Sequence, residues 1–154
     1  MISGIAVFDA SPLIAFRQIE QFDLLRDLFR EILVPTVVAQ EVAPSRGTLP
    51  GWIHVEGDFP SPAWSRKLDA GERAAIALAM HVSADVVVLD DLAGRTMAAE
   101  LGLAAVGSFG LLVRAKQSGL ISEVRPLMEA MISQGNYASD ELYRRILSLA
   151  GEAE

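Results

Sequence analysis

The stretch VVVLDD at residues 86–91 is the most informative part of this chain. Three valines and a leucine form an apolar run of strand length, and two adjacent carboxylates, Asp90 and Asp91, follow it directly. Strands buried on both faces of a parallel sheet are continuous apolar runs of this kind. In open α/β sheets, ligands bind outside the carboxyl ends of such strands. The stretch therefore predicts a buried parallel strand that delivers acids to a site.

The start of the chain has the same pattern. The apolar run IAVF at residues 5–8 is followed by Asp9, and then by Ser11 and Pro12, which fit an N-cap and the first position of a helix. Two strands far apart in the sequence thus each end in an acid. Because the carboxyl ends of parallel strands meet at one edge of a sheet, we expect one acidic pocket. Such a pocket indicates a divalent cation, which prefers oxygen ligands.

The rest of the chain alternates short apolar runs with helical patterns. Further strands are expected at residues 32–34, 53–55 and 104–106. Helices are expected near residues 11–18, 20–30, 35–42, 68–81, 91–101, 109–118, 122–133 and 139–149. This alternation predicts an α/β three-layer sandwich around a central, mainly parallel sheet of four to five strands, with right-handed crossovers. We expect one domain over residues 1–150 and a frayed tail at residues 151–154.

Composition limits the function classes. The 154 residues include no cysteine, which excludes disulfides and zinc–thiolate sites and fits a reducing cytosol. No apolar run reaches the roughly 18 residues that span a bilayer, and the start lacks a basic signal-peptide region, so we expect a soluble, cytoplasmic protein. The net charge of −7 disfavours tight non-specific binding to nucleic acid. Without the five acids assigned below to one pocket, 15 acidic residues face 13 basic ones.

Two glutamates are further candidates for this pocket. Glu41 lies near the end of its helix, where the helix dipole favours cations; a solvated glutamate is the alternative. Asp69 and Glu72 fit a capping box, which is a sufficient structural reason for the pair. The helix that follows is apolar nearly all round and must be buried. Glu72 shares a face with Ile76, so it should point toward the packed side, where a carboxylate needs a partner.

The residues around the two strand ends leave alternatives open. One of Asp90 and Asp91 can cap the next helix, but both cannot, so the sequence does not decide which of them serves the pocket. Arg95, one turn after Asp91, predicts either an ordinary ion pair or an arginine that orients Asp91 or meets a phosphate. Ser11 is either an N-cap or a hydroxyl that holds a metal-bound water. The stretch GSFG at residues 107–110 forms either a tight turn or a phosphate-binding helix start.

Taken in order, these segments resemble the PIN-domain family, and within it a prokaryotic branch related to VapC-type toxins. The resemblance runs from about residue 5 to residue 149 and is carried by DASPLI at 9–14, VPTVV at 34–38, EV at 41–42, GE at 71–72, AAIALA at 74–79, LDD at 89–91 and GR at 94–95. It implies that acids of the pocket hold Mg²⁺ or Mn²⁺ and serve catalysis, with Ser11 and Arg95 around the substrate. The implied catalytic and metal-binding acids are Asp9, Glu41, Glu72, and Asp90 or Asp91. The third of these is often aspartate in VapC-type proteins.

The resemblance implies a metal-dependent endoribonuclease that hydrolyses RNA phosphodiester bonds as the toxin of a toxin–antitoxin pair. Its expected partners are the RNA substrate, a cognate antitoxin protein and a second copy of the chain. The alternative is a catalytically degenerate PIN-like module that binds a protein or RNA partner. A phospho-accepting receiver domain fits poorly, because it needs paired acids after the first strand and a lysine after a late one. Here Asp9 stands alone, and the last strand leads into Gly107 and Ser108.

Overall fold

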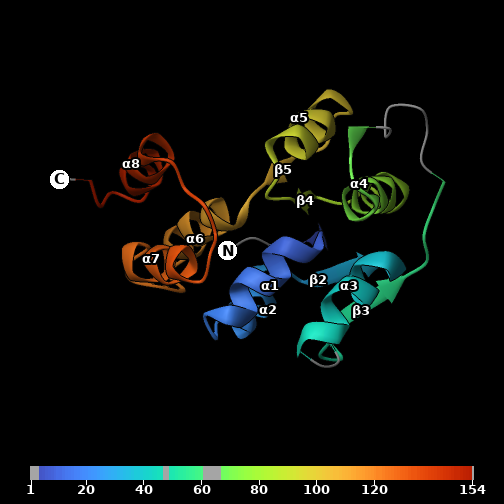
Figure 1. The fold of residues 1–154 in the computed structure, drawn as a ribbon, viewed down its shortest axis with the longest axis horizontal. Helices are drawn as coiled ribbons and strands as arrows, with labels where there is room; N and C mark the ends of the chain where they lie inside the picture. Colours follow the sequence, from blue (N-terminus) through green and yellow to red (C-terminus); the bar gives the residue numbers. More distant parts are fainter. Residues whose placement is uncertain (1–3, 47–48, 61–66, 154) are drawn as a thin grey trace.

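A five-stranded sheet in the order β3-β2-β1-β4-β5 forms the centre of the molecule (Figure 1). The computed structural model describes residues 4–46, 49–60 and 67–153. The strands are β1 (Ile5–Phe8), β2 (Glu31–Pro35), β3 (Ile53–Glu56), β4 (Val86–Val88) and β5 (Ala105–Val106). Each neighbouring pair is parallel. The predicted α/β sheet is thus confirmed, and it is parallel throughout these strands.

Successive residues of each central strand enter opposite cores, as the two-residue period of a strand requires. Phe8 and Val88 lie in one core, whereas Val7 and Val87 lie in the other. All four side chains are fully buried. This is the physical reason for the uninterrupted apolar runs: in a sheet covered on both sides, no position of a central strand faces water.

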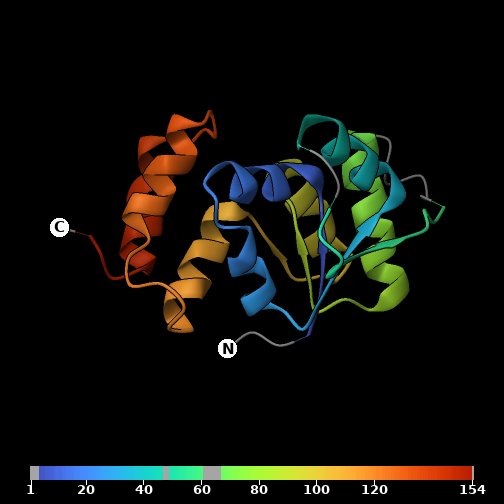
Figure 2. The ribbon, with the colours of Figure 1, turned by 90° about the horizontal axis from the view of Figure 1, so that it is seen from below.

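Helices cover both faces of the sheet (Figures 1 and 2). α4 and α5 pack on the face that presents Val7, and α1, α2, α3 and α6 pack on the opposite face. Their bounds are α1 Ala10–Gln18, α2 Phe22–Leu28, α3 Thr36–Arg46, α4 Ala70–Val82, α5 Leu92–Glu100 and α6 Ser108–Gln117. The expected three layers are therefore present. No helix in the described part of the chain is long and apolar enough to cross a membrane.

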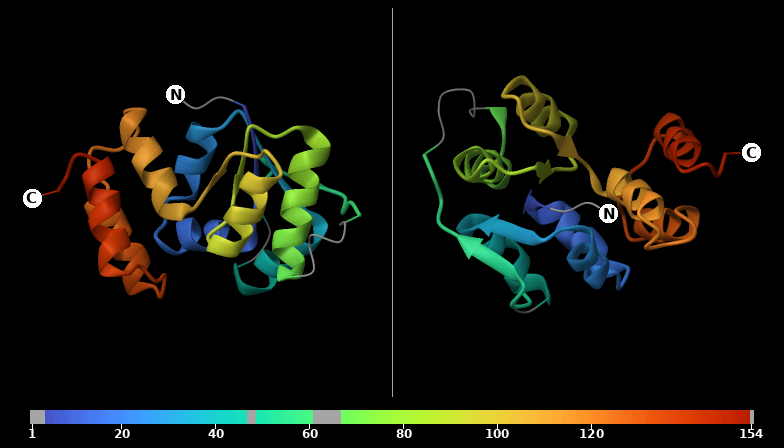
Figure 3. Two further views of the ribbon diagram at one scale, coloured as in Figure 1. Left: turned by 90° about the horizontal axis from the view of Figure 1, so that it is seen from above. Right: turned by 180° about the vertical axis from the view of Figure 1, so that it is seen from behind.

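Two further helices, α7 (Arg125–Ser133) and α8 (Asp140–Leu149), extend the molecule at one end of its long axis (Figure 3). Both pack against α6, and α7 also contacts α1. Their buried side chains, among them Met128, Met131 and Ile146, join the core on the α1 side of the sheet. The C-terminal helices are thus continuous with the main core.

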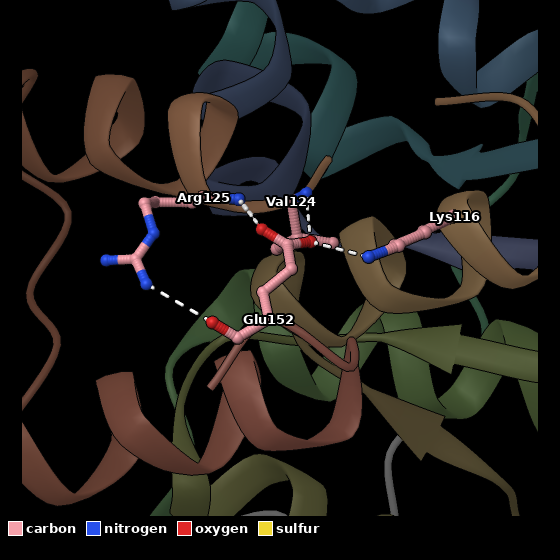
Figure 4. A network of polar contacts seen from close by, with 4 residues as sticks. All are labelled: Lys116, Val124, Arg125 and Glu152. Carbon is pink, nitrogen blue, oxygen red and sulfur yellow. Dashed lines mark hydrogen bonds and ion pairs between the residues drawn. The ribbon is translucent and has the colours of Figure 1, made fainter. Parts of the chain in front are cut away.

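The C-terminal tail is held at Glu152, where we expected fraying (Figure 4). The Glu152 carboxylate accepts hydrogen bonds from the backbone N–H groups of Val124 (2.6 Å) and Arg125 (3.0 Å) and from Lys116 Nζ (3.1 Å). Burial acts to raise the pKa of Glu152, but these N–H groups and the lysine charge outweigh it and hold the pKa below its usual value. The physical reason is that Val124, the N-cap residue of α7, provides no side-chain cap, so Glu152 supplies the missing acceptor. Glu154 lies outside the described residues.

Replacing Glu152 by alanine is expected to lower the free energy of unfolding by about 1–2 kcal/mol, the usual cost of losing a helix cap. This corresponds to a fall in melting temperature of about 2–8 °C for a domain of this size. The matched control is Glu123→Ala, which removes an exposed acid next to the same helix start. Differential scanning calorimetry of both variants is the measurement. Equal melting temperatures for the two variants would show that the tail contact contributes nothing.

Candidate functional site

Asp9 lies at the carboxyl end of β1, and its position is fixed by the sheet. Its backbone N–H donates to the Val88 carbonyl oxygen at 3.0 Å, which continues the β1–β4 pairing by one residue. Asp9 is the N-cap residue of α1, yet its side chain makes no capping hydrogen bond. The side chain is nevertheless only 7% exposed. Capping therefore does not explain this carboxylate, and it is available to a ligand.

Glu41 of α3 meets Asp9 above the first turn of α4. A Cβ atom placed on Gly71 would lie 2.7 Å from Asp9 Oδ1 and 3.0 Å from Glu41 Oε1. Glycine is thus required here, because any side chain would displace one of the two carboxylates. Partial burial, and after it the charge of Asp69, raise the pKa of Glu41 above its usual value. The predicted convergence of these two acids from distant segments is present in the structure.

Asp69 and Glu72 form the capping box that begins α4. Asp69 Oδ1 accepts from the Glu72 N–H at 2.8 Å, and Glu72 Oε1 accepts from the Asp69 N–H at 3.1 Å. This reciprocal bonding places the two carboxyl groups side by side. Single oxygens of Asp9, Asp69 and Glu72 lie within 4.8 Å of one another. These three acids form the centre of the acidic cluster, with Glu41 beside them.

Asp69 was not among the predicted site residues, since the capping box accounted for it completely. The signal was nevertheless present in the sequence. In a capping box each of the two side chains accepts a hydrogen bond from the backbone N–H of the other residue, which keeps the two side chains close together. Placing Glu72 in the pocket therefore also places Asp69 there. The helix cap and the acidic cluster are the same structure.

Glu72 is a buried carboxylate with one unused oxygen. The residue is 3% exposed, and its Oε2 atom accepts no hydrogen bond. This oxygen points toward the start of α5, because a Cβ placed on Gly94 would lie 3.2 Å from it. Burial first, then the charge of Asp69, and then the hydrogen-bonding contact and charge of the Asp91 carboxylate raise the pKa of Glu72 to about 7 against the opposing Asp69 N–H. A buried anionic oxygen without a donor is what a cation would satisfy.

The electrostatics of Asp9 point the same way. Burial is the main cause that raises the pKa of Asp9 to about 7, opposed by the Ala10 N–H. The charges of Asp69, Glu41 and Asp90 raise this pKa further. Like charges in one place disfavour each other's ionisation. Near neutral pH the cluster therefore binds protons that a cation would displace.

The structure gives Asp90 and Asp91 different places. Asp91 is the N-cap of α5, and its Oδ1 accepts from the Ala93 N–H at 2.9 Å. The Asp90 carboxylate accepts instead from the backbone N–H of Ser108 (2.7 Å) and from its hydroxyl (2.8 Å). Asp90 is thus oriented by the start of α6 and adds its charge at Asp9. Sequence reasoning treated the 107–110 stretch as a turn or a phosphate site and missed Ser108 as the partner of Asp90.

Arg95 supports the end of β4 and does not pair with Asp91. Its Nη1 donates to the carbonyl oxygens of Leu89 (3.0 Å) and Asp90 (2.7 Å). The ordinary ion pair considered from the spacing is therefore wrong. The physical reason is that these two carbonyls lie beyond the last residue of β4 and need donors. Arg95 and the exposed Ser11 both line a cavity of about 580 Å³ next to Asp90.

Gly71→Ala is expected to weaken divalent-cation binding about tenfold or more, as displaced ligand supports usually do. The added methyl group meets the oxygens of Asp9 and Glu41. The same change should alter the stability of the metal-free protein little, because the gain of up to about 1 kcal/mol for alanine over glycine in a helix opposes the cost of moving Asp9. Calorimetric titration with Mn²⁺ and a thermal melt measure the two effects.

The matched control is Gly57→Ala, since a Cβ there has no atom within 4 Å. It should titrate with Mn²⁺ like the wild type. Unchanged Mn²⁺ affinity in Gly71→Ala would mean that Asp9 and Glu41 do not act together on a cation.

A known protein family and a solved structure are similar to this chain. A family model described as DUF3368: PIN domain matches residues 5–152. One similar solved structure is a PilT N-terminus domain protein from the hyperthermophilic archaeon Sulfolobus solfataricus P2. It has 15% sequence identity and a TM-score of 0.45, over 88% of this chain and 99% of that chain. The comparison with curated proteins found no match.

Proposed function

Because this chain belongs to the PIN-domain family, we propose that it is a metal-dependent endoribonuclease that hydrolyses RNA phosphodiester bonds. The family supplies the nuclease class. The observation that carries the proposal is the convergence of Asp9, Asp69 and Glu72 within 4.8 Å of one another. Asp9 comes from the end of β1, whereas Asp69 and Glu72 come from the start of α4. The raised pKa values of Asp9 and Glu72, to about 7, reflect the burial and crowding of negative charge.

The residues of the cluster fit a hard divalent cation. Their side chains offer only carboxylate oxygens, the donors that Mg²⁺ and Mn²⁺ prefer. Asp9, Asp69 and Glu72 would hold the ion, and the unpartnered Glu72 Oε2 is the oxygen that most needs one. Glu41 and Asp90 lie beside them as further ligands. When bound, such an ion supplies Lewis acidity at the scissile phosphate.

The protein's own residues position the reaction. Glu41 is exposed, whereas Asp9 and Glu72 are buried, so Glu41 is the glutamate that solvent and substrate reach most easily. We assign it to orient the attacking water and accept its proton. Water adds to phosphorus as its proton passes to Glu41, the bond from phosphorus to the 3′ oxygen breaks, and this oxygen takes up a proton from solvent, which leaves a 5′ phosphate and a 3′ hydroxyl.

Three residues would organise the rim of the site. Ser108 fixes the carboxylate of Asp90 through two hydrogen bonds, which reduces the motion of a candidate ligand. Arg95 uses Nη1 on carbonyl oxygens, and the rest of its guanidinium would offset charge on the non-bridging phosphate oxygens. Ser11 lies beside Asp9 and would hold a water at the same edge. Asp91 would act mainly through the start of α5, which it caps.

The resemblance to VapC-type toxins extends this proposal to the biological role. We propose that the protein is the toxin of a toxin–antitoxin pair, acts in the cytoplasm, and forms a homodimer. Its antitoxin would cover the acidic cluster, with a basic side chain entering it. Expression in a bacterial host should then arrest growth, and co-expression of the adjacently encoded partner should relieve the arrest.

A second candidate is a catalytically degenerate module that binds protein or RNA. One observation favours it: the N–H of Asp69 occupies Oε1 of Glu72, which leaves a single oxygen of this residue for a cation. A degenerate site of this kind would show no saturable Mn²⁺ binding.

The experiment is cleavage of a mixed RNA pool with Mg²⁺ or Mn²⁺, compared with EDTA. The wild type and the matched control Asp27→Asn, an exposed acid on α2, should produce fragments with 5′ phosphates only when metal is present. Asp9→Asn should not. Equal cleavage by Asp9→Asn would reveal a contaminating nuclease. Absence of both cleavage and Mn²⁺ binding would favour the degenerate module.

A further inference from the structure

A cavity of about 580 Å³ adjoins the acidic cluster. It lies between the start of α6, the segment before α8, and α8 itself. Asp90 links the two places, because its carboxylate lines this cavity and also raises the pKa of Asp9. The volume is within the range of about 300–1,000 Å³ that is usual for small-molecule sites. Nothing described so far uses the part of the cavity that faces α8.

The lining combines an apolar wall with a few polar groups. The apolar side chains are those of Val106, Phe109, Leu142, Ile146 and Leu149. Asn136, Tyr137 and Arg145 add an amide, a phenol and a guanidinium. Tyr137 is 84% exposed, an unusual position for a large aromatic ring. An apolar slot with an exposed ring and an amide suits a flat heteroaromatic group with hydrogen-bonding edges.

The charge of the cavity differs from that of the whole chain. The protein carries a net charge of −7, but the charged side chains that line the cavity are Arg95, Arg145 and Asp90. Two cationic groups therefore face one anion, whose charge would be offset when the acidic cluster holds a cation. An anionic nucleotide is accepted more easily here than over the remaining acids.

We propose that this cavity binds the nucleobase next to the scissile phosphate and that Tyr137 and Asn136 set the base preference of cleavage. The inference rests on the proposed nuclease function. The aromatic ring of Tyr137 stacks on the base, the Asn136 amide contacts its polar edge, and the Arg145 guanidinium pairs with the adjoining phosphate. The base is thereby held next to Asp90, which lines the same cavity and borders the acidic cluster.

The first test uses the four nucleoside 5′-monophosphates, which offer no internucleotide bond to cleave. Saturation-transfer NMR on the full chain should detect base protons in contact with the protein. Tyr137→Ala should weaken binding about tenfold, the usual size of the loss of base stacking. Arg145→Ala should weaken the binding of the nucleotides but leave the binding of the phosphate-free nucleosides unchanged.

The matched control is Arg144→Ala, which removes the same charge from the neighbouring exposed position of α8 outside the cavity lining. It should bind nucleotides within about twofold of the wild type. Equal losses of nucleotide affinity in Arg144→Ala and Arg145→Ala would mean that only the overall charge of the protein matters, and this would overturn the inference. Absence of saturation transfer to every nucleotide would also overturn the inference and would favour a protein segment as the occupant of the cavity.

The second test separates this inference from the nuclease function. Sequencing of the 5′ ends produced from a random RNA pool should show a base preference that Tyr137→Ala flattens, while Arg144→Ala keeps it. Cleavage with an unchanged preference in Tyr137→Ala would contradict the cavity's role and leave the nuclease intact. Nucleotide binding without any RNA cleavage would contradict the nuclease and leave base binding.

Discussion

Asp9→Asn is expected to lower RNA cleavage about a thousandfold or more and, at the same time, to stabilise the metal-free protein. The first effect follows because Asp9 is the buried acid proposed to hold the ion at the centre of the cluster, and removal of one group that stabilises the transition state costs about 10²–10³ in rate even where no metal is lost with it. The second follows because the native fold holds a carboxylate whose pKa is raised to about 7, mainly by burial. Asparagine occupies the same volume without the charge.

The size of the stabilisation can be bounded. Each unit of pKa shift is worth about 1.4 kcal/mol, and relaxation of the site reduces the full value, so we expect on the order of 2 kcal/mol at pH 8. Thermal melting in EDTA should then show an increase of about 4–8 °C. The exposed control Asp27→Asn should change neither activity nor melting temperature appreciably. A destabilised Asp9→Asn would mean that the carboxylate has a structural partner and is not held for a ligand.

Addition of Mn²⁺ is expected to raise the melting temperature of the wild type by about 5–10 °C at pH 8. At a free concentration one hundred times the Kd, binding contributes about 2.7 kcal/mol, and each kcal/mol is worth about 2–4 °C. Mg²⁺ should act in the same direction. Asp9→Asn should lose most of the increase, because the ion then lacks its central ligand.

This increase should depend on pH. The pKa values of Asp9 and Glu72 are raised from 3.8 and 4.5 to about 7, so between about pH 4 and 7 the folded metal-free protein binds more protons than the unfolded chain. The contribution of these two groups to stability is therefore full below about pH 4 and is lost as the pH rises through about 7. The ion competes with these protons, so its effect should be smaller at pH 5.5 than at pH 8.

Glu152 titrates in the opposite sense, because its lowered pKa stabilises the fold above its usual pKa. The informative quantity is therefore the difference between wild type and Asp9→Asn across pH, since Glu152 is common to both. A Mn²⁺ effect of equal size at pH 5.5 and pH 8 would contradict proton competition at the cluster.

The layers of the fold could be predicted well, because a strand that is buried on both faces of a sheet has an uninterrupted apolar sequence. The apolar runs at 5–8 and 86–89 have no polar position, and β1 and β4 lie at the centre of the sheet. The convergence of Asp9 and Glu41 was also predicted, since the carboxyl ends of parallel strands share an edge. The requirement for glycine at residue 71 was not, because a close approach of two carboxylates has no signature in a single sequence.

The residues that sequence reasoning missed are explained by contacts between distant segments. Asp69 had a sufficient local role as a helix cap, and nothing local indicated a second one. Arg95 was placed by its spacing from Asp91, but the unpaired carbonyls after β4 bind it instead. Glu152 caps a helix that begins 27 residues earlier, at Arg125, and no short-range pattern reveals such a pair. Short-range sequence patterns determine the helices and strands, whereas the hydrogen-bond partners of polar side chains depend on which segments the complete fold brings together.

The measurement that tests the central claim most directly is anomalous diffraction from a crystal soaked in Mn²⁺. We predict a peak bounded by carboxylate oxygens of Asp9, Asp69 and Glu72, with Glu72 Oε2 among its ligands. A soaked crystal without a peak at these three residues, or with its peaks only at exposed acids elsewhere on the surface, would contradict the account.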